Sequence, residues 1–416
     1  MKVRYSALAD RGSECKLRVM RSIGLGSQIL IGMAVGSVLG IGLGEDVSML
    51  RPVGDLFIRL LVLAAIPLVF FNLLAGVTAL SDVKSFGRLA GKTMTYYVTT
   101  DVIALILGVG AMAVLRPGSG MQLTGEIDGS VGAVPSVADV LLGMIPTNVF
   151  AAFAEGNVVQ IVVIAVLVGI ATLLLPAESR IRLVRAYHDV ASLFRRLVDV
   201  ILLTAPFGIG ALMAVTVGTY GAALLGPMAR FLLGVYLAQL VVFVGYMGLM
   251  KFGADRSPLR FLRETGPLWA TTAATTSSLA SLSVSLETAE RIRLPSSIYS
   301  FTLPLGAQLN KDGTSVMLGA VLLFTAQAAG VSFTPASLVS VVLVGLLLSE
   351  GSGGIPGGGF VIALIYVQAF NLPIEVAAIV GGIYRLVDMG NTTINVMGDL
   401  VGTSLVTRSE SRRGIP

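Results

Sequence analysis

Charged residues are scarce in this chain, and so are the side chains that most often bind metals. Only 13% of the 416 residues are charged, about half the share of an average soluble chain, whereas 55% are hydrophobic. A single histidine and a single cysteine leave no Cys/His zinc site and no internal disulfide. With a mean hydropathy of +0.87, this composition excludes a soluble enzyme, a coiled coil and a disordered scaffold. It predicts a membrane protein.

Glycine and the distribution of charge refine this prediction. The 49 glycines are typical of close-packed or broken transmembrane helices. The net charge of +5 arises largely at the chain ends and in short loops, so it indicates topology rather than nucleic-acid binding. Six basic residues in segment 1–22 place the N-terminus in the cytoplasm. His188 lies in the arginine-rich segment 178–196, where we expect an ordinary solvated side chain.

Apolar runs alternate with charged loops over the first 250 residues, which predicts about six spans. A basic loop with Lys84, Arg88 and Lys92 separates the second run from the third. The fourth run contains Pro146 and Gly156 and is expected to be broken. The runs are 23–44, 53–80, 96–115, 140–176, 198–224 and 226–250.

Two polar tracts interrupt the apolar segments of the last 160 residues. The Ser/Thr tract 271–278 has basic residues on both flanks, which favours a helical hairpin that enters and leaves from the cytoplasm. The glycine-rich tract 349–359 has none, so its hairpin should enter from outside. A span with a polar interruption follows each hairpin, at 310–314 and at 388–395. Hairpin and broken helix, repeated from opposite sides, predict the inverted repeat of a secondary transporter with its substrate near the midplane.

Charged residues inside spans cost about 2.5–3.5 kcal/mol each, so each is a functional candidate. Asn310, Asp312 and Thr314 offer oxygen ligands for an alkali cation, and Asn395 and Asp399 offer a second set. The alternative is a hydrogen-bonded packing network between helices. The charged candidates are Asp101, Lys311, Asp312, Glu350, Arg385, Asp388 and Asp399.

Five motifs of the last third resemble those of the glutamate/aspartate transporter family, the dicarboxylate/amino acid:cation symporters. They are Ser277 with Ser278, 300–306, 310–314, 354–359 and 388–399, and the early segments 54–60 and 67–70 with Tyr96, Tyr97 and Thr100 are also similar. The likeness covers essentially the whole chain. It implies an all-α integral membrane protein with eight transmembrane helices and two re-entrant helical hairpins with inverted repeats. It also implies an elevator-type transporter that forms a homotrimer.

The resemblance also implies a division into a scaffold and a mobile transport domain. The protein would lie in the inner (cytoplasmic) membrane as a multi-pass protein with both termini in the cytoplasm. The implied segments are a cytoplasmic N-terminal segment 1–22, scaffold helices 1 and 2 in 23–92, the third helix of the transport domain and an outer loop in 93–137, scaffold helices 4 and 5 in 138–224, the rest of the transport domain in 225–408 and a cytoplasmic tail 409–416.

Site residues follow from the resemblance position by position. Asp388 would bind the substrate ammonium group, and Thr314 would line the side-chain pocket. Asn395, Thr392 and Ser278 would hold the substrate carboxylate together with the backbone of 355–359. The full substrate set is Ser277, Ser278, Thr314, Ile355, Gly359, Asp388, Asn391, Thr392 and Asn395.

Three sodium positions are implied in the same way. One would use Gly306, Asn310, Asn395 and Asp399; a second would use Gln308 and the backbone from Ser349 to Ser352; a third would use Tyr97, Thr100, Asn310 and Asp312. Asn310, Asp312 and Asp399 are therefore the principal candidates for Na⁺ ligands.

Asn391 stands where members with acidic substrates have an arginine that pairs with the side-chain carboxylate. Asparagine lacks the bidentate charged fork of arginine, which favours a neutral amino acid. Asp388 favours an amino acid over a plain dicarboxylate, which has no ammonium group to neutralise a buried carboxylate. Arg385 could supply the missing charge only by reaching across from its neighbouring position, which leaves acidic substrates open.

Lys311 and Asp101 are further departures from the family pattern. Lys311 stands where sodium-coupled members usually have methionine, and Asp101 stands where a hydroxyl residue is expected. A buried ammonium beside Asp312 could replace a sodium ion, with Asp101 and Lys311 as a compensating pair. Either group could instead carry a coupled proton. Alternatively, Lys311 turns outward and nothing changes.

The sequence therefore predicts a secondary active transporter of a small, neutral amino acid with weakened or replaced sodium dependence, not an enzyme. It would use Na⁺ or H⁺ as coupling ion and no cofactor, within a lipid bilayer and without nucleic acid. The alternative is a sodium- or proton-coupled symporter of aspartate, glutamate or dicarboxylates; an anion channel is more remote. An intramembrane hydrolase with Ser277 or Ser278 as nucleophile is disfavoured, because Asp312 would keep its lysine base, Lys311, protonated.

Overall fold

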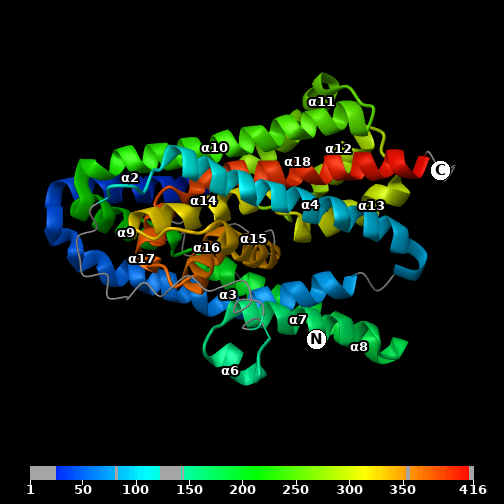
Figure 1. The fold of residues 1–416 in the computed structure, drawn as a ribbon, viewed down its shortest axis with the longest axis horizontal. Coiled ribbons are helices and arrows are strands. Elements are labelled where there is room, and N and C mark those ends of the chain that lie inside the picture. Colours follow the sequence, from blue (N-terminus) through cyan, green and yellow to red (C-terminus); the bar gives the residue numbers. More distant parts are fainter. Residues whose placement is uncertain (1–24, 80–82, 122–141, 143–144, 353–356, 412–416) are drawn as a thin grey trace, which may run out of the picture.

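The computed structural model describes residues 25–79, 83–121, 142, 145–352 and 357–411, and this part of the chain contains helices and no strand. The prediction of an all-α chain is confirmed for these residues. Ile355 and the segment 1–22 lie outside them. The helices form two groups, each defined by which helices pack together (Figure 1).

The first group surrounds α3, which packs against α7, α8 and α9. A 3-10 turn, η1, joins α2 to α3, and a second, η3, follows α9. The short helix α6 packs on α7. The bounds are α2 Leu25–Leu43, η1 Gly44–Leu50, α3 Arg51–Ala79, α6 Val149–Ala154, α7 Val158–Leu173, α8 Ala177–Leu202, α9 Ala205–Tyr220 and η3 Gly221–Leu224.

Glycines bring α2 and α9 into close backbone contact. Gly32 and Gly36 lie one turn apart on α2, and a Cβ atom on them would come within 2.2 Å and 2.1 Å of carbonyl oxygens of α9. Gly40, a further turn along, is equally crowded. Small residues at every fourth position let two helix backbones approach in this way. Any larger residue would therefore force the two helices apart.

The segment predicted as one span at 198–224 is divided in the structure. The arginine-rich segment 178–196 is helical and forms most of α8, and His188 is exposed there. α8 and α9 meet at an angle of 56° around Leu203 and Thr204. The division follows from composition, because α8 is strongly amphipathic whereas α9 is apolar on all sides.

The second group is built around α4, α10, α14 and α18, which pack against one another and run along the long axis of the molecule (Figure 1). A Cβ atom on Gly108 of α4 would lie 2.1 Å from the carbonyl oxygen of Val316 on α14, so the two helix backbones are in close contact. The predicted basic loop is wrong: Arg88 and Lys92 belong to the first turns of α4, which begins at Val83. The bounds are α4 Val83–Leu115, α10 Leu225–Gly248, η4 Leu249–Gly253, α14 Asp312–Ala328 and α18 Tyr384–Ser411.

Both polar tracts lie between paired helices, as a hairpin requires. α11 packs against α12 around the Ser/Thr tract, and α15 packs against α16 around the glycine-rich tract. α13 ends at Leu309 and α14 begins at Asp312, so the predicted break at 310–314 is present. The bounds are α11 Pro258–Thr275, α12 Leu282–Arg291, α13 Ser296–Leu309, α15 Pro335–Ser349, η5 Glu350–Ser352, α16 Gly358–Ala369 and α17 Ile374–Gly381.

The second predicted interruption, at 388–395, is wrong. α18 is one helix from Tyr384 to Ser411, and the chain breaks before it, between α17 and α18. Asp388, Asn391 and Asn395 recur at spacings of three and four, which places them on one face of an intact helix. Thr393 donates to the carbonyl of Met389 at 2.8 Å, so its hydroxyl bonds within the helix instead of opening it.

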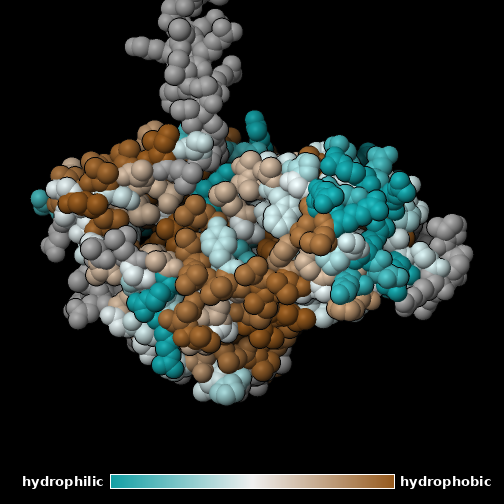
Figure 2. All heavy atoms as spheres, turned by 90° about the horizontal axis from the view of Figure 1, so that it is seen from above, coloured by the Kyte–Doolittle hydropathy of each residue, from teal (hydrophilic) through white to brown (hydrophobic). Residues whose placement is uncertain are grey.

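By length and composition, two described helices can cross a membrane, Gly87–Leu115 and Gly226–Gly253, and the bent pair α8 and α9 would make a third. Shorter apolar helices include α7, α15 and α16. Figure 2 shows a broad hydrophobic area over the middle of the molecule and a hydrophilic end. This end is the one where α12 and the C-terminal turns of α18 lie in Figure 1.

Candidate substrate and cation site

The break between α13 and α14 is joined to α18 by Asn310. The Asn310 backbone is extended, with φ −78° and ψ 116°, so the helix cannot continue. Its Nδ2 donates to the carbonyl of Asn395 at 3.0 Å and to Oδ1 of Asp399 at 2.9 Å, and its Oδ1 has no partner. Asn310 and Asp399 were both predicted as cation ligands, and the structure brings them into contact.

Asn395 caps the N-terminus of α14 from another helix. Its Oδ1 accepts hydrogen bonds from the backbone amides of Gly313 at 2.7 Å and Thr314 at 3.3 Å. Its Nδ2 donates to Oγ1 of Thr314 at 3.2 Å. The first amides of a helix lack partners within it, so an acceptor placed there stabilises the helix. Asn395, which was predicted to hold the substrate carboxylate, thus uses its side chain for hydrogen bonds within the protein.

Tyr97, Gly306 and Asp399 meet on the other side of the break. A Cβ atom on Gly306 would lie 2.2 Å from Oδ1 of Asp399 and 2.5 Å from the hydroxyl of Tyr97. The Tyr97 hydroxyl donates to the carbonyl of Thr302 at 2.9 Å. Only glycine fits at position 306, and the predicted ligands from α4, α13 and α18 converge there.

Asp312 and Asp101 form a buried acidic region between α4 and α14. Tyr246 of α10 donates to Oδ2 of Asp312, and Oδ1 of Asp312 has no partner. Thr100 of the third predicted sodium set lies next to the Asp312 carboxyl group, and so does Asp101. Ser315 donates to Oδ1 of Asp101 at 3.1 Å. The sequence analysis missed Tyr246 and Ser315.

Lys311 is buried, with 1% of its surface exposed, so the alternative of an outward-turned side chain is wrong. Its Nζ donates to the carbonyl of Ala307 at 2.9 Å. The carboxyl groups of Asp399, Glu350 and Asp101 lie close enough to act on its charge. Among the described residues, no ion pair joins Lys311 to a carboxylate. Lys311 and Asp101, the predicted compensating pair, are therefore not in direct contact. We call Asp101, Lys311, Asp312, Glu350 and Asp399 the cation cluster, and the two side chains interact at longer range within it.

The remaining predicted cation positions are Gln308 and the segment from Ser349 to Ser352. Gln308 is half-buried, and the Ser349 hydroxyl donates to the carbonyl of Leu346 at 2.9 Å. Glu350, which directly follows Ser349, has a buried Oε2 without a partner, and it lies next to Asp101. The side chain of Ser352 is outside the described set.

Asp388 lies between the tips of the two hairpins. Tyr384 donates to its Oδ1 at 2.9 Å, and the amide of Gly357 donates to its Oδ2 at 3.3 Å. Gly357 has φ 78°, a left-handed conformation that favours glycine, and it is the N-cap residue of α16. Thr276, next to Ser277 at the tip of the hairpin of α11 and α12 (hairpin 1), also lies beside Asp388. The predicted ammonium ligand is thus buried and reached by both hairpins.

Other predicted substrate residues lie on the two hairpins and on α14 and α18. The hydroxyl of Ser277 accepts a hydrogen bond from the amide of Ala280 at 3.1 Å, while Ser278 and Thr392 are buried. Thr314 and Gly359 face each other across α14 and α16, with 3.3 Å between the Thr314 methyl group and an ideal Cβ on Gly359.

Asn391 and Arg385 are held by other parts of the protein. Gln239 of α10 donates to Oδ1 of Asn391 at 2.8 Å, and Nδ2 of Asn391 is buried without a partner. Arg385 donates to Thr276 and, at 2.8 Å, to the carbonyl of Ala274. These are the last groups of α11, where a cation is favourable. The sequence analysis missed Gln239, because a lone glutamine in an apolar span gives no signal of its partner.

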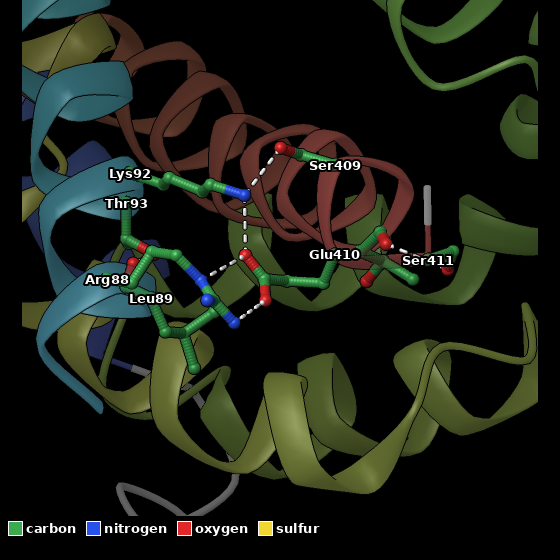
Figure 3. Close-up of polar contacts among 8 residues, drawn as sticks. Arg88, Leu89, Lys92, Thr93, Ser409, Glu410 and Ser411 are labelled. Carbon is green, nitrogen blue, oxygen red and sulfur yellow. Dashed lines mark hydrogen bonds and ion pairs between the residues drawn. The ribbon is translucent and has the colours of Figure 1, made fainter. Parts of the chain in front are cut away.

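A further polar cluster joins α4 to the end of α18 (Figure 3). Nη2 of Arg88 donates to Glu410 at 2.7 Å, and Nζ of Lys92 donates to Glu410 at 2.5 Å and to Ser409 at 2.6 Å. The hydrogen bonds from Arg88, and then those from Lys92, lower the pKa of Glu410. We call these four residues the Glu410 cluster.

Two helical hairpins, a helix broken between Leu309 and Asp312 and a buried polar site between them define a membrane transport protein. Residues 25–409 match the model of the sodium:dicarboxylate symporter family, and the chain belongs to this family. The resemblance seen in the sequence is thereby confirmed. Membership makes the chain a transport protein rather than an enzyme, and one that uses a coupling ion, Na⁺ or H⁺, in place of a cofactor.

Characterised relatives cover nearly the whole chain. The proton/glutamate-aspartate symporter of Bacillus subtilis is 32% identical over 396 residues, which is 92% of this chain and 94% of the relative. The proton/sodium-glutamate symport protein of Geobacillus stearothermophilus is 29% identical over 408 residues, 94% of this chain and 96% of the relative. The C4-dicarboxylate transport protein of Rhizobium etli is 30% identical over 393 residues, 92% of this chain and 88% of the relative.

Proposed function

We propose that this chain carries a small, neutral amino acid across the cytoplasmic membrane by an elevator mechanism, and that Lys311 takes the place of one coupling sodium ion. The observation that supports the substrate is Asn391, whose amide is held by Gln239 at the position where the family pattern has arginine. The observation that supports the altered coupling is the burial of Lys311 among candidate cation ligands.

Asp388 and Asn391 favour a neutral amino acid as substrate. The Asp388 carboxylate can bind an ammonium group, which a plain dicarboxylate lacks. An acidic side chain would need a buried positive partner, because an unpaired buried charge is costly. Arg385 cannot be that partner while both of its bonds go to hairpin 1. The free Nδ2 of Asn391 is a neutral donor, which suits an uncharged side chain.

Lys311 supports a reduced need for sodium. Its ammonium group bonds to the carbonyl of Ala307, one residue before Gln308 in the predicted cation segment. A buried positive charge at this place offsets Asp399, Glu350 and Asp101 without a bound ion. Substrate binding would then depend little on external sodium, and a proton would be the remaining candidate for a coupled ion.

The mobile part of the proposed elevator would consist of 93–137 and 225–408, and 23–92 with 138–224 would be the scaffold. Packing within the two helix groups supports this division. The Glu410 cluster suggests one adjustment, because it joins residues before 93 to α18. We therefore propose that the mobile part begins at Val83. A homotrimer with both termini in the cytoplasm completes the proposal.

A second candidate is a proton-coupled symporter of aspartate, glutamate or a C4-dicarboxylate. The substrates named for the relatives favour it, and Arg385 lies close enough to act on Asp388. An acidic substrate would then have to release Arg385 from hairpin 1. An anion channel is the remaining alternative, and substrate-independent current in a planar bilayer would identify it.

Calorimetric binding to the purified protein tests the proposal. Alanine, serine, glutamine, aspartate, glutamate and succinate would be titrated in sodium, potassium and choline buffers. We expect a neutral amino acid to bind with similar affinity in all three. Binding restricted to aspartate, glutamate or succinate would overturn the proposed substrate. Binding that appears only in sodium would overturn the proposed role of Lys311.

A further inference from the structure

We propose that Tyr384 sets the size limit of the substrate. This inference rests on the proposed function, in which Asp388 binds the ammonium group of a small amino acid. Tyr384 is the first residue of α18, one turn before Asp388, and only 5% of its surface is exposed. It belongs to none of the motifs that identify the family, so its role must come from the geometry.

The hydroxyl of Tyr384 lies directly beside Gly359. A Cβ atom on Gly359 would lie 2.6 Å from the Tyr384 hydroxyl oxygen, 3.2 Å from Cε of Met317 and 3.3 Å from Cγ2 of Thr314. These three atoms converge on one point in front of the Gly359 backbone, where not even a methyl group fits without displacing a neighbour. Thr314 lines the proposed side-chain pocket and Gly359 belongs to the proposed substrate set, so Tyr384 and Met317 take up the space beside both residues.

The ring of Tyr384 is held in this position from two sides. It packs against Phe360 of α16 with 5.4 Å between ring centroids and 40° between ring planes. At its far end, the hydroxyl donates to Asp388. A substrate side chain that pushed the ring away would break a hydrogen bond to a buried carboxylate and disturb the packing of α16 on α18.

The hydroxyl therefore has two effects that can be separated. The hydrogen bond positions the Asp388 carboxylate, and its loss should change the affinity for every amino acid by a similar factor. The space occupied by the oxygen restricts only the longer side chains. The ratio of two affinities, one for a short and one for a longer side chain, reports the second effect alone.

The test is Tyr384→Phe, studied by calorimetry with glycine, alanine, serine, threonine and valine on the full-length protein. We expect the ratio of the affinity for threonine or valine to the affinity for alanine to rise about tenfold. This is the lower limit of the discrimination that one added methylene group usually produces in a pocket. Tyr366→Phe is the matched control. Tyr366 is also fully buried, but its hydroxyl donates to the carbonyl of Val341 at 2.5 Å, away from Asp388.

An unchanged ratio in Tyr384→Phe would overturn the size limit, provided that the parent protein binds alanine or serine. A parent protein that binds no neutral amino acid would instead overturn the proposed function. If Tyr384→Phe cannot be purified, Met317→Ala opens the same point from α14 and should shift the ratio in the same direction. No shift in Met317→Ala would then overturn the inference.

Discussion

Replacing Lys311 with methionine should convert the protein into one whose substrate binding depends on sodium. Methionine has a similar length and no charge, so the change removes the ammonium group and keeps most of the volume. Three carboxyl groups, Asp399, Glu350 and Asp101, then lose the positive charge that acts on them. Removing one member of a buried charged set costs about 3–5 kcal/mol when nothing replaces it. A bound sodium ion can replace it.

The size of the effect follows from the coupling between ion and substrate. Coupling free energies between sites are typically about 1–3 kcal/mol, or roughly 5–150-fold in affinity. We expect Lys311→Met to bind substrate that much more tightly in sodium than in choline, whereas the parent protein binds equally in both. Thermal unfolding of the variant should likewise be shifted upward by sodium, because an ion that binds only the folded state stabilises it.

Lys251→Met is the matched control for this experiment. Lys251 is exposed, with its Nζ 5.2 Å from the centroid of the Phe252 ring, and it is not part of the cation cluster. Its substitution should leave binding unchanged in both buffers. Equal affinities of Lys311→Met in sodium and in choline would refute the reasoning that the ammonium group substitutes for an ion.

Three further predictions concern substrate choice and stability. Asn391→Arg should strengthen the binding free energy for aspartate by about 1.5–3 kcal/mol, the contribution of a hydrogen bond to a charged group. Calorimetry that shows no such increase would exclude Asn391 as the residue that selects against acidic substrates. Glu410→Gln should lower the free energy of unfolding by about 1 kcal/mol at neutral pH, because Glu410 is buried but its partner Arg88 is half exposed, and ion pairs in contact with solvent contribute little. Because the pKa of Glu410 is lowered in the fold, this difference should hold above the ordinary value of 4.5 and disappear as the pH falls through the lowered pKa; denaturation at several pH values measures it. Gly36→Ala should cost about 1–3 kcal/mol through contact with α9, whereas Gly42→Ala on the same helix, with nothing within 4 Å, should be neutral or stabilising in thermal melts.

The sequence was most informative where polarity contradicts the surrounding apolar segment. The hairpin tracts and the break at Asn310 were predictable because Ser, Thr, Gly and Asn inside a span have no ordinary explanation. Asp388, Asp312 and Lys311 were predictable for the same reason, since a buried charge is costly. The break expected at 388–395 was not found, because side chains spaced along one face of a helix can be polar without opening its backbone.

Residues that support the site could not be found in this way. Tyr246, Tyr384 and Gln239 lie in helices where an aromatic or a single amide is compatible with ordinary core packing. The roles of Gln239 and Tyr246 depend on contacts of α10 with α18 and α14, and that of Tyr384 depends on its contact with Gly359 of α16, all far apart in the sequence. Likewise, the sequence placed Lys311 beside Asp312, but their side chains leave the backbone break in different directions.

The cap that Asn395 places on α14 has a consequence for the unloaded carrier. Its side chain satisfies two amides of that helix when nothing is bound, and Lys311 supplies a positive charge to the same region. A vacant site would otherwise leave exposed helix amides and uncompensated negative charge in a low-dielectric environment, which would hinder its passage through the membrane interior. Under the proposed function, the Asn395 cap and the Lys311 charge lower both of these costs, while Oδ1 of Asp312 and Oε2 of Glu350 stay without a partner. Under the proposed function, we expect such a carrier to return without cargo and therefore to need no exchange partner for net movement down a concentration gradient.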